Sequence, residues 1–276
     1  MAVIDAPVSE ILSLAHVESA LALSIEAGWN QTPDDWAFFT ERGRARGIFV
    51  DGELIATAAT LTYGSRLGYV SMILVTPRFR NRGIAKQLLR ESVDDLESRG
   101  YRALLDATPA GAVVYRRLGF VDVFPSRRWQ GDGHAASGAV LRTATLPNVE
   151  TLIVQDALAF GADRPFLIRN LLARAGTHAL VSDVGFVVRR KGNRADQIGP
   201  LVAADGPGAQ QLLFAAIGLG AGPVFLDVPD HQQSLGHFLE ALGFSVQRPF
   251  TRMGRGLSTQ PGNPARLFVT AGPEFG

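Results

Sequence analysis

The chain has 276 residues, of which 46% are hydrophobic, and this suits two domains of about 130 residues with full cores. The formal net charge of +1 argues against a nucleic-acid-binding protein, because such proteins usually carry a basic face for phosphate contacts. The chain contains no cysteine, so disulfides, thiolate zinc sites and cysteine nucleophiles are excluded.

The sequence shows no export or membrane signal. Residues 1–5 lack the basic start of a signal peptide, and the most apolar stretch, 212–226, is interrupted by glycines and a proline, so we read it as helix, loop and strand. The five histidines are scattered without the spacing of metal ligands. We therefore expect a cytoplasmic protein with no membrane partner and no metal.

The first predicted elements are two helices. Apolar residues recur at helical spacing in 16–27. A second helix begins near Asp34, with Thr32 or Asp34 as the residue that caps its free amides.

A β-hairpin and a further strand follow. Residues 47–50 and 53–61 are strand-like runs joined by Asp51-Gly52, a dipeptide typical of a two-residue hairpin turn. Residues 69–75 are the next apolar strand-like run.

The most informative segment is the basic turn after this run. A strand, a turn and a helix that begins at Gly83 or Ile84 form an anion site, because the first amides of a helix lack intrahelical partners and carry the positive end of its dipole. Gly83 and Ala85 let a diphosphate approach the backbone closely. Positive charge comes from four nearby side chains, Arg78, Arg80, Arg82 and Lys86.

The helix after the turn ends at Gly100. Residues 101–107 then predict a mostly apolar strand, and residues 109–118 a short helix that runs into Gly119-Phe120. The order helix, helix, hairpin, strand, helix, strand, helix, strand predicts a mixed α/β (α+β) domain with one twisted sheet.

Two motifs carry a resemblance to a known family. The run Val75-x-Pro77-x-x-Arg80-Asn-Arg-Gly83-Ile-Ala85 resembles the acetyl-CoA signature of the GNAT superfamily of N-acetyltransferases. Further along, Tyr115-Arg-Arg-Leu-Gly119-Phe120 resembles the second GNAT signature, so the resemblance spans roughly residues 10–130. The sequence departs from the family pattern at three positions, Asn81, Thr108 and Gly111. Asparagine tolerates left-handed backbone conformations, so Asn81 can still make the turn.

The resemblance implies direct transfer of an acetyl group from acetyl-CoA to an amine, without a covalent enzyme intermediate. It places the pantetheine arm and the thioester along the backbone of Ile73, Leu74 and Val75. The residues expected to hold the rest of acetyl-CoA are Arg80, Asn81, Arg82, Gly83, Ile84, Ala85 and Lys86. Tyr115 is the candidate general acid for the departing thiolate, and the alternative is a tyrosine that only packs at the end of its helix.

A general base is not evident, because the strand 69–75 contains no acidic residue or histidine. Asp106 is one candidate, acting directly or through water. Its counterpart in the second half, Asp227, favours a structural role instead. The family pattern points to the first two helices for the acceptor, with Trp29 and Asp34 as candidate substrate-binding residues. Core packing and the helix dipole are the alternative explanations for these two residues.

The second half of the chain repeats the first. Leu242-Gly243-Phe244 echoes Leu118-Gly119-Phe120, and an arginine stands eight residues after each phenylalanine, at Arg128 and Arg252.

The copy has lost the features of the anion site. Its loop between Val202 and Ala209 is shorter than the first and has no basic residue, and Asp205 within it would repel a diphosphate. Leu239 stands where the first half has Tyr115.

We therefore expect a catalytic domain over 1–142, a linker over 143–148 and a degenerate GNAT-like domain over 149–276. This tandem arrangement resembles the bacterial YitH-type acetyltransferases.

The expected activity is transfer of acetyl from acetyl-CoA to a primary amine of a small-molecule acceptor. The alternative is a non-catalytic acyl-CoA-binding sensor or regulatory module, and acetylation of a protein is a third possibility. The sequence leaves open the acceptor, the acyl length and the choice between monomer and homodimer.

Overall fold

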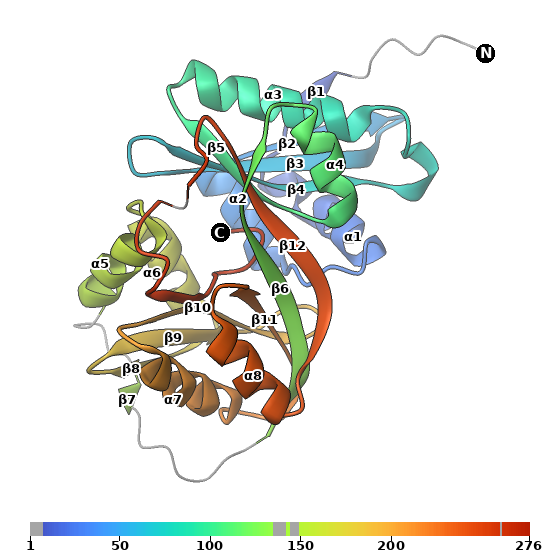
Figure 1. Ribbon diagram of the computed structural model, residues 1–276. Helices are drawn as coiled ribbons and strands as arrows, with labels where there is room; N and C mark the ends of the chain where they lie inside the picture. The colour runs from blue at the N-terminus through green and yellow to red at the C-terminus, as the bar shows by residue number, and fades with distance from the viewer. Residues whose placement is uncertain (1–7, 135–141, 144–148, 260) are drawn as a thin grey trace.

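The computed structural model describes residues 8–134, 142–143, 149–259 and 261–276. In the first half, the predicted helices, hairpin and strands are present in the predicted order, preceded by a short strand, β1, that was not predicted (Figure 1). The helices are α1 (Val17–Glu26), α2 (Pro33–Arg42), α3 (Ile84–Ser98) and α4 (Pro109–Arg116), with 3-10 turns η1 (Leu14–His16) and η2 (Pro77–Phe79). The strands are β1 (Ser9–Ile11), β2 (Arg44–Val50), β3 (Glu53–Tyr63), β4 (Leu67–Val75), β5 (Arg102–Ala107) and β6 (Val121–Gly133).

The second half has a similar succession of elements. Its helices are α5 (Val149–Phe160), α6 (Pro165–Ala173), α7 (Gly206–Ile217) and α8 (Gln233–Ala241). Its strands are β7 (Arg142–Thr143), β8 (His178–Ser182), β9 (Gly185–Arg190), β10 (Asp196–Ala203), β11 (Gly222–Pro229), β12 (Ser245–Arg255) and β13 (Leu267–Val269). The stretch 212–226 is helix, loop and strand, as predicted. Of the expected linker 143–148, residues 144–148 lie outside the described residues. Within the described ranges, no helix combines the length and the apolar character needed to cross a bilayer.

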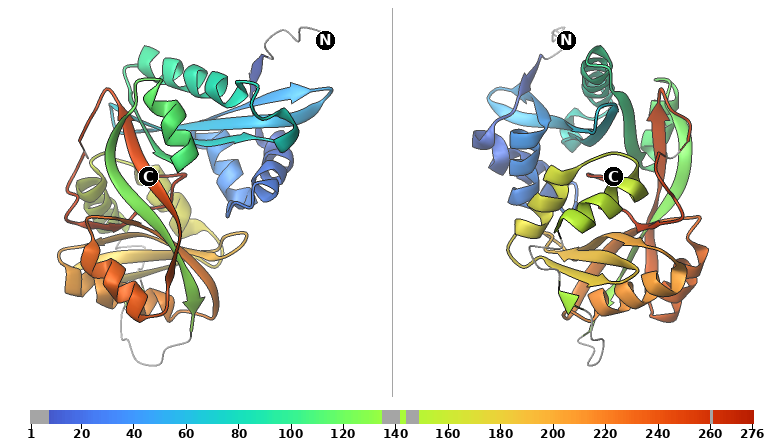
Figure 2. Two further views of the ribbon diagram at one scale, coloured as in Figure 1. Left: turned by 45° about the vertical axis from the view of Figure 1, so that its right-hand side comes forward. Right: turned by 90° about the vertical axis from the view of Figure 1, so that its left-hand side faces the viewer.

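The two halves share one mixed sheet because strands β6 and β12, which follow the last helix of each half, are exchanged between the halves. The strand order is β1-β2-β3-β4-β5-β12-β6-β11-β10-β9-β8-β7, and β13 pairs with β10. Strand β12 of the second half pairs with β5 of the first, and β6 of the first half pairs with β11 of the second. Strands β6 and β12 also pair with each other. In Figure 2 they form a long twisted ribbon that joins the halves.

Helices cover both faces of the sheet in each half. In the first half, α1 and α2 share a buried cluster with one face, and α3 and α4 share another cluster with the opposite face. In the second half, α7 and α8 pack on one face, and α5 and α6 on the other. Each sheet face is therefore buried, as the apolar strands require.

An aromatic cluster joins the halves close to the site. Phe275, from the last residues of the chain, lies 5.7 Å from Phe38 and 5.4 Å from Phe39 between ring centroids. Tyr63 stacks on Phe166 of α6 and donates a hydrogen bond of 2.9 Å to the carbonyl of Phe275. These contacts fix the C-terminal segment against the first half.

Candidate active site

The site begins at an opening between β4 and β5. The two parallel strands pair only where Leu67–Tyr69 face Arg102–Leu104. Beyond that point β4 contains a bulge, since Ala59 pairs with Ser71 whereas Thr57 pairs with Leu74. The extra residue is Met72, whose φ of 55° is unusual for a side chain of its size.

A side chain of the neighbouring strand holds the bulge. The hydroxyl of Thr57 donates a hydrogen bond of 2.9 Å to the carbonyl of Met72, and both residues are buried. The bulge comes where pairing with β5 stops, so among the described residues the 73–75 backbone has no strand partner on that side. Unpaired strand edges of this kind bind extended polar chains.

A cavity lies at this opening, and we call it the outer cavity. It is lined by Ala27, Trp29, Ile73, Leu74, Val75, Phe79, Arg80, Asn81, Gly83, Ile84, Ala85, Lys86, Thr108, Ala110, Val114 and Arg117. Nine of the ten residues predicted to bind acetyl-CoA are therefore brought to one cavity, and Arg82 is the exception.

The turn before α3 has the conformation that the sequence implied. Asn81 adopts a left-handed conformation with φ 61°, and Gly83, the N-cap of α3, has φ 81°. Because Gly83 has no side chain to cap the helix, the first amides of α3 remain available to an anion. Arg80 is held at the turn by a hydrogen bond of 3.0 Å from its Nε to the carbonyl of Val75.

Arg82 lies elsewhere on the turn. Its guanidinium lies 4.9 Å from the centre of the Phe79 ring and donates a hydrogen bond of 3.2 Å to the carbonyl of Arg78. Its side chain does not line the outer cavity, so its positive charge can act there only by long-range electrostatic attraction.

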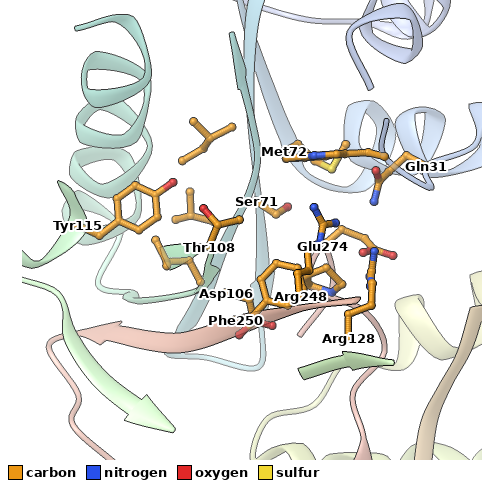
Figure 3. Close-up of a pocket in the computed structure, with 15 residues that line it drawn as sticks. Gln31, Ser71, Met72, Asp106, Thr108, Tyr115, Arg128, Arg248, Phe250 and Glu274 are labelled. Atoms are coloured by element: carbon orange, nitrogen blue, oxygen red, sulfur yellow. The ribbon is translucent and has the colours of Figure 1, made fainter. Parts of the chain in front are cut away.

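A second cavity adjoins the first, and we call it the inner cavity (Figure 3). It is lined by Trp29, Gln31, Val70, Ser71, Met72, Ile73, Leu105, Asp106, Thr108, Tyr115, Arg128, Arg248, Phe250, Pro273 and Glu274. Trp29, Ile73 and Thr108 line both cavities. In Figure 3, Tyr115 stands on one side of the inner cavity, whereas Gln31, Arg128 and Glu274 stand on the other.

Tyr115 is positioned by its own helix. Thr108 caps α4 by accepting a hydrogen bond of 3.3 Å from the Gly111 amide. A Cβ at Gly111 would lie 3.1 Å from the Tyr115 ring, so glycine leaves room for that ring. The ring also packs against Phe120, with 6.2 Å between centroids. Burial raises the pKa of Tyr115 to about 12, so the phenol keeps its proton at neutral pH.

Asp106 lines the inner cavity, but both its oxygens are engaged. Arg252 donates from Nε to Oδ1 at 2.9 Å and from Nη2 to Oδ2 at 2.8 Å. This arrangement matches the structural role that the sequence left open for Asp106.

The two predicted acceptor-binding residues have different surroundings. Trp29 is half-buried and lines both cavities. Asp34 is exposed in the first turn of α2 and lines neither cavity. Its neighbour Asp35 is the buried acid of that turn, and it is paired with Arg174 at 2.5 Å.

Apart from Thr108, which the family motif marks, sequence reasoning did not assign five polar residues of the inner cavity to the site: Gln31, Ser71, Arg128, Arg248 and Glu274. Four of them have a buried polar atom without a hydrogen-bond partner: Gln31 Oε1, Ser71 Oγ, Arg248 Nε and Glu274 Oε2. No local motif marks these residues. The repeat register singled out Arg128 alone, and without a role.

In the second half the corresponding anion position is occupied by the chain itself. Asp205 is the N-cap of α7, and its carboxylate accepts a hydrogen bond of 2.8 Å from the Gly208 amide. A negative side chain thus lies where the first half offers free amides.

The strand opening of the second half is also filled. Strands β10 and β11 pair in parallel over Asp196–Ile198, and β13 pairs with β10 beyond that point, with Val269 facing Leu201. The next residue, Thr270, donates from its amide to the carbonyl of Asp227 at 3.0 Å. In the described part of the chain no cluster of three or more histidine or acidic side chains could hold a metal ion.

Comparison with known proteins agrees with this geometry. The profile of the acetyltransferase (GNAT) family matches residues 10–120, and that of an acetyltransferase (GNAT) domain matches residues 152–269. A relative, the uncharacterized N-acetyltransferase YitH of Bacillus subtilis (strain 168), is 23% identical over 253 residues, which cover 86% of this chain and 88% of the relative.

Solved structures share the fold over almost the whole chain. A putative acetyltransferase from Pyrococcus horikoshii superposes with a TM-score of 0.84 at 18% identity, covering 100% of this chain and 98% of the other. A tandem GNAT protein from the clavulanic acid biosynthesis pathway superposes with a TM-score of 0.62 at 15% identity, covering 90% of this chain and 97% of the other. With GNAT domains matched in both halves and a tandem GNAT fold throughout, this chain belongs to the GNAT superfamily of acyltransferases.

Proposed function

We propose that this protein transfers the acetyl group of acetyl-CoA directly to a primary amine of a small-molecule acceptor. The observation that supports this most strongly is the junction of the two cavities. The outer cavity has the anion-binding turn, the inner cavity has the Tyr115 phenol, and Trp29, Ile73 and Thr108 line both. A thioester at this junction would meet an amine that arrives from the inner cavity.

Acetyl-CoA fits the outer cavity chemically. The free amides at the start of α3 and the charge of Lys86 suit a diphosphate. The β4 backbone at 73–75 suits the amide groups of a pantetheine arm, since it lacks a strand partner on its open side. The described part of the second half has neither feature, which supports one acetyl-CoA per chain.

The proposed reaction needs few protein groups. The amine nitrogen attacks the thioester carbonyl carbon, a C–N bond forms and the C–S bond breaks. Tyr115 then gives its phenolic proton to the departing thiolate and regains a proton from water before the next turnover. The proton lost by the amine passes to water, because both oxygens of the other candidate base, Asp106, already accept hydrogen bonds from Arg252.

The position of the inner cavity supports a small acceptor. Its walls come from both halves, including Met72 of β4, Arg248 of β12 and Glu274 near the C-terminus. A cavity walled by both halves suits a metabolite better than a side chain on the surface of a folded protein.

The test is release of free thiol from acetyl-CoA across a library of amines, followed by mass spectrometry of the products. We expect thiol release and N-acetylation with at least one small amine. The sensor alternative is not favoured, because the Tyr115 phenol that lines the inner cavity suits protonation of a thiolate, which a sensor would not need. Tight binding of acetyl-CoA with no release for any amine would support the sensor and contradict the proposal.

A further inference from the structure

We infer that the acceptor is an amino acid or a close relative, a small molecule with a carboxylate as well as an amine, and that Arg248 binds the carboxylate. This inference rests on the proposed function and names the acceptor class for the same site. It comes from the charges around the inner cavity.

Most guanidinium groups near the inner cavity have an acid partner. Arg128 is paired with Asp227 at 2.8 Å. The cavity acid Glu274 is paired with Arg190 at 2.6 Å, through Oε1. These pairs, like that of Asp106 with Arg252, cancel in charge.

Arg248 is different, because no acid pairs with it in the part of the chain that the structure describes. It stands at the inner cavity with its guanidinium 5.0 Å from the centre of the Phe250 ring. Its Nε is buried and has no hydrogen-bond partner. Burial lowers the pKa of Arg248, and the nearby positive charge of Arg128 lowers it further. The carboxylates of Asp227 and Glu274, which do not pair with Arg248, oppose this lowering of the pKa only in part.

Arg248 as a whole is half-buried, but its Nε is buried with neither a counter-ion nor a hydrogen-bond partner among the described residues. This is unfavourable, and an anionic ligand that reached the Nε would relieve that cost. One uncompensated positive charge matches a monoanion such as a carboxylate. A planar carboxylate also suits the geometry of a guanidinium, which presents parallel N–H donors.

The other unpartnered atoms of the cavity suit the rest of an amino acid. Glu274 Oε2, Gln31 Oε1 and Ser71 Oγ are buried, line the cavity and have no hydrogen-bond partner. All three can accept hydrogen bonds from an amine or ammonium group. The cavity thus offers free acceptors together with a free cation, which complements a zwitterion. A simple amine would leave Arg248 unpaired.

The experiment compares matched acceptors on the full chain. Thiol release is measured with the standard L-amino acids and with the amine that each yields on decarboxylation, for the wild type and for Arg248→Met. We expect the wild type to favour the amino acid. Arg248→Met should raise the KM for the amino acid by about tenfold or more while leaving the KM for the decarboxylated amine unchanged, as loss of a charge-assisted hydrogen bond implies.

The matched control is Arg127→Met. Arg127 belongs to the adjacent strand β6, its side chain is 51% exposed and paired with Asp230, and it does not line the inner cavity. We expect this variant to behave as the wild type. Unchanged melting temperature and acetyl-CoA affinity in Arg248→Met would show that the variant folds.

A binding measurement makes the test independent of turnover. N-acetyl amino acids and the matching N-acetyl amines are titrated into the protein saturated with CoA. Preferential binding of the carboxylate-bearing compounds, lost in Arg248→Met, supports the inference. Equal binding of both series, an equal effect of the substitution on both, or no binding or turnover of any amino acid overturns it. Preferred acetylation of simple amines would overturn the inference while leaving the proposed function intact. If no amine of any kind causes thiol release, that result counts against the proposed function itself.

Discussion

Asp106 and Arg252 lie 146 residues apart in the chain and form a buried bidentate ion pair across the two halves, with N–O distances of 2.9 and 2.8 Å. Arg128 and Asp227 form the matching pair in the opposite direction, at 2.9 and 2.8 Å. Each half therefore supplies the arginine that neutralises the aspartate of the other. The exchange of β6 and β12 produces this reciprocity, because each arginine belongs to an exchanged strand.

We predict that Arg252→Met strongly destabilises the protein. The Arg252 side chain is 0% exposed and that of Asp106 is 4% exposed, so the substitution leaves a buried carboxylate without its partner. The free energy of unfolding should fall by about 3–5 kcal/mol. Urea denaturation measures this change.

Two further variants make this prediction specific. Arg116→Met breaks an ion pair whose side chains are 49% and 48% exposed, and it should change the stability far less than Arg252→Met does. The double variant Asp106→Leu/Arg252→Met removes both buried charges and should recover much of the loss. A double variant no more stable than Arg252→Met would contradict this account of the pair.

We predict that Thr57→Val weakens the binding of acetyl-CoA. The substitution keeps the shape of the side chain and removes the hydrogen bond to the Met72 carbonyl that holds the β4 bulge. The free energy of unfolding should fall by about 1–2 kcal/mol, and the Kd for acetyl-CoA should rise as the opening loses its shape. Isothermal titration calorimetry measures the Kd.

The control is Thr60→Val, on the same strand. Thr60 is also buried and pairs with Val70 on the other side of the bulge, but its hydroxyl does not bond to the bulge. If both variants bind acetyl-CoA equally well, the bulge does not shape the site.

We predict that Tyr115→Phe lowers kcat by about a hundredfold or more without changing the Kd for acetyl-CoA, because only proton transfer to the thiolate is lost.

The pH dependence of the activity follows from the raised pKa of Tyr115. A phenol donates its proton only below its pKa, and burial raises the pKa of Tyr115 to about 12. Activity should therefore rise with pH as the acceptor amine loses its proton. No decrease in activity should occur at any pH below about 10. A wild-type descending limb near neutral pH that Tyr115→Phe abolishes would show that the phenol titrates far lower.

The conformation of the turn before α3 could be predicted because its determinants are local. Gly83 and Asn81 adopt positive φ within a few residues of the helix that they precede, and their chemistry can be read from the chain. The hairpin at Asp51-Gly52 formed as predicted for the same reason. The internal repeat could also be recognised in the sequence, because both halves keep the short run Leu-Gly-Phe.

The exchange of strands could not be predicted. The segments that become β6 and β12 carry an arginine in the same register, at Arg128 and Arg252, so either could complete either half of the sheet. Packing between distant segments decides the pairing, and single-strand patterns do not record it. The far wall of the inner cavity was missed for a related reason, because Arg248 and Glu274 reach the site only through the exchanged strand and the C-terminal segment.

The central claim is that the turn before α3, and no part of the second half, holds acetyl-CoA. Calorimetric titration of acetyl-CoA into Gly83→Trp and Gly100→Trp tests it most directly. The two glycines flank the same helix with φ of 81° and 80°, and neither has a neighbour near its missing Cβ, so the backbone strain is matched. We predict one acetyl-CoA per chain for the wild type and for Gly100→Trp, and no binding for Gly83→Trp. Unchanged binding by Gly83→Trp, or a second acetyl-CoA per chain, would contradict the account.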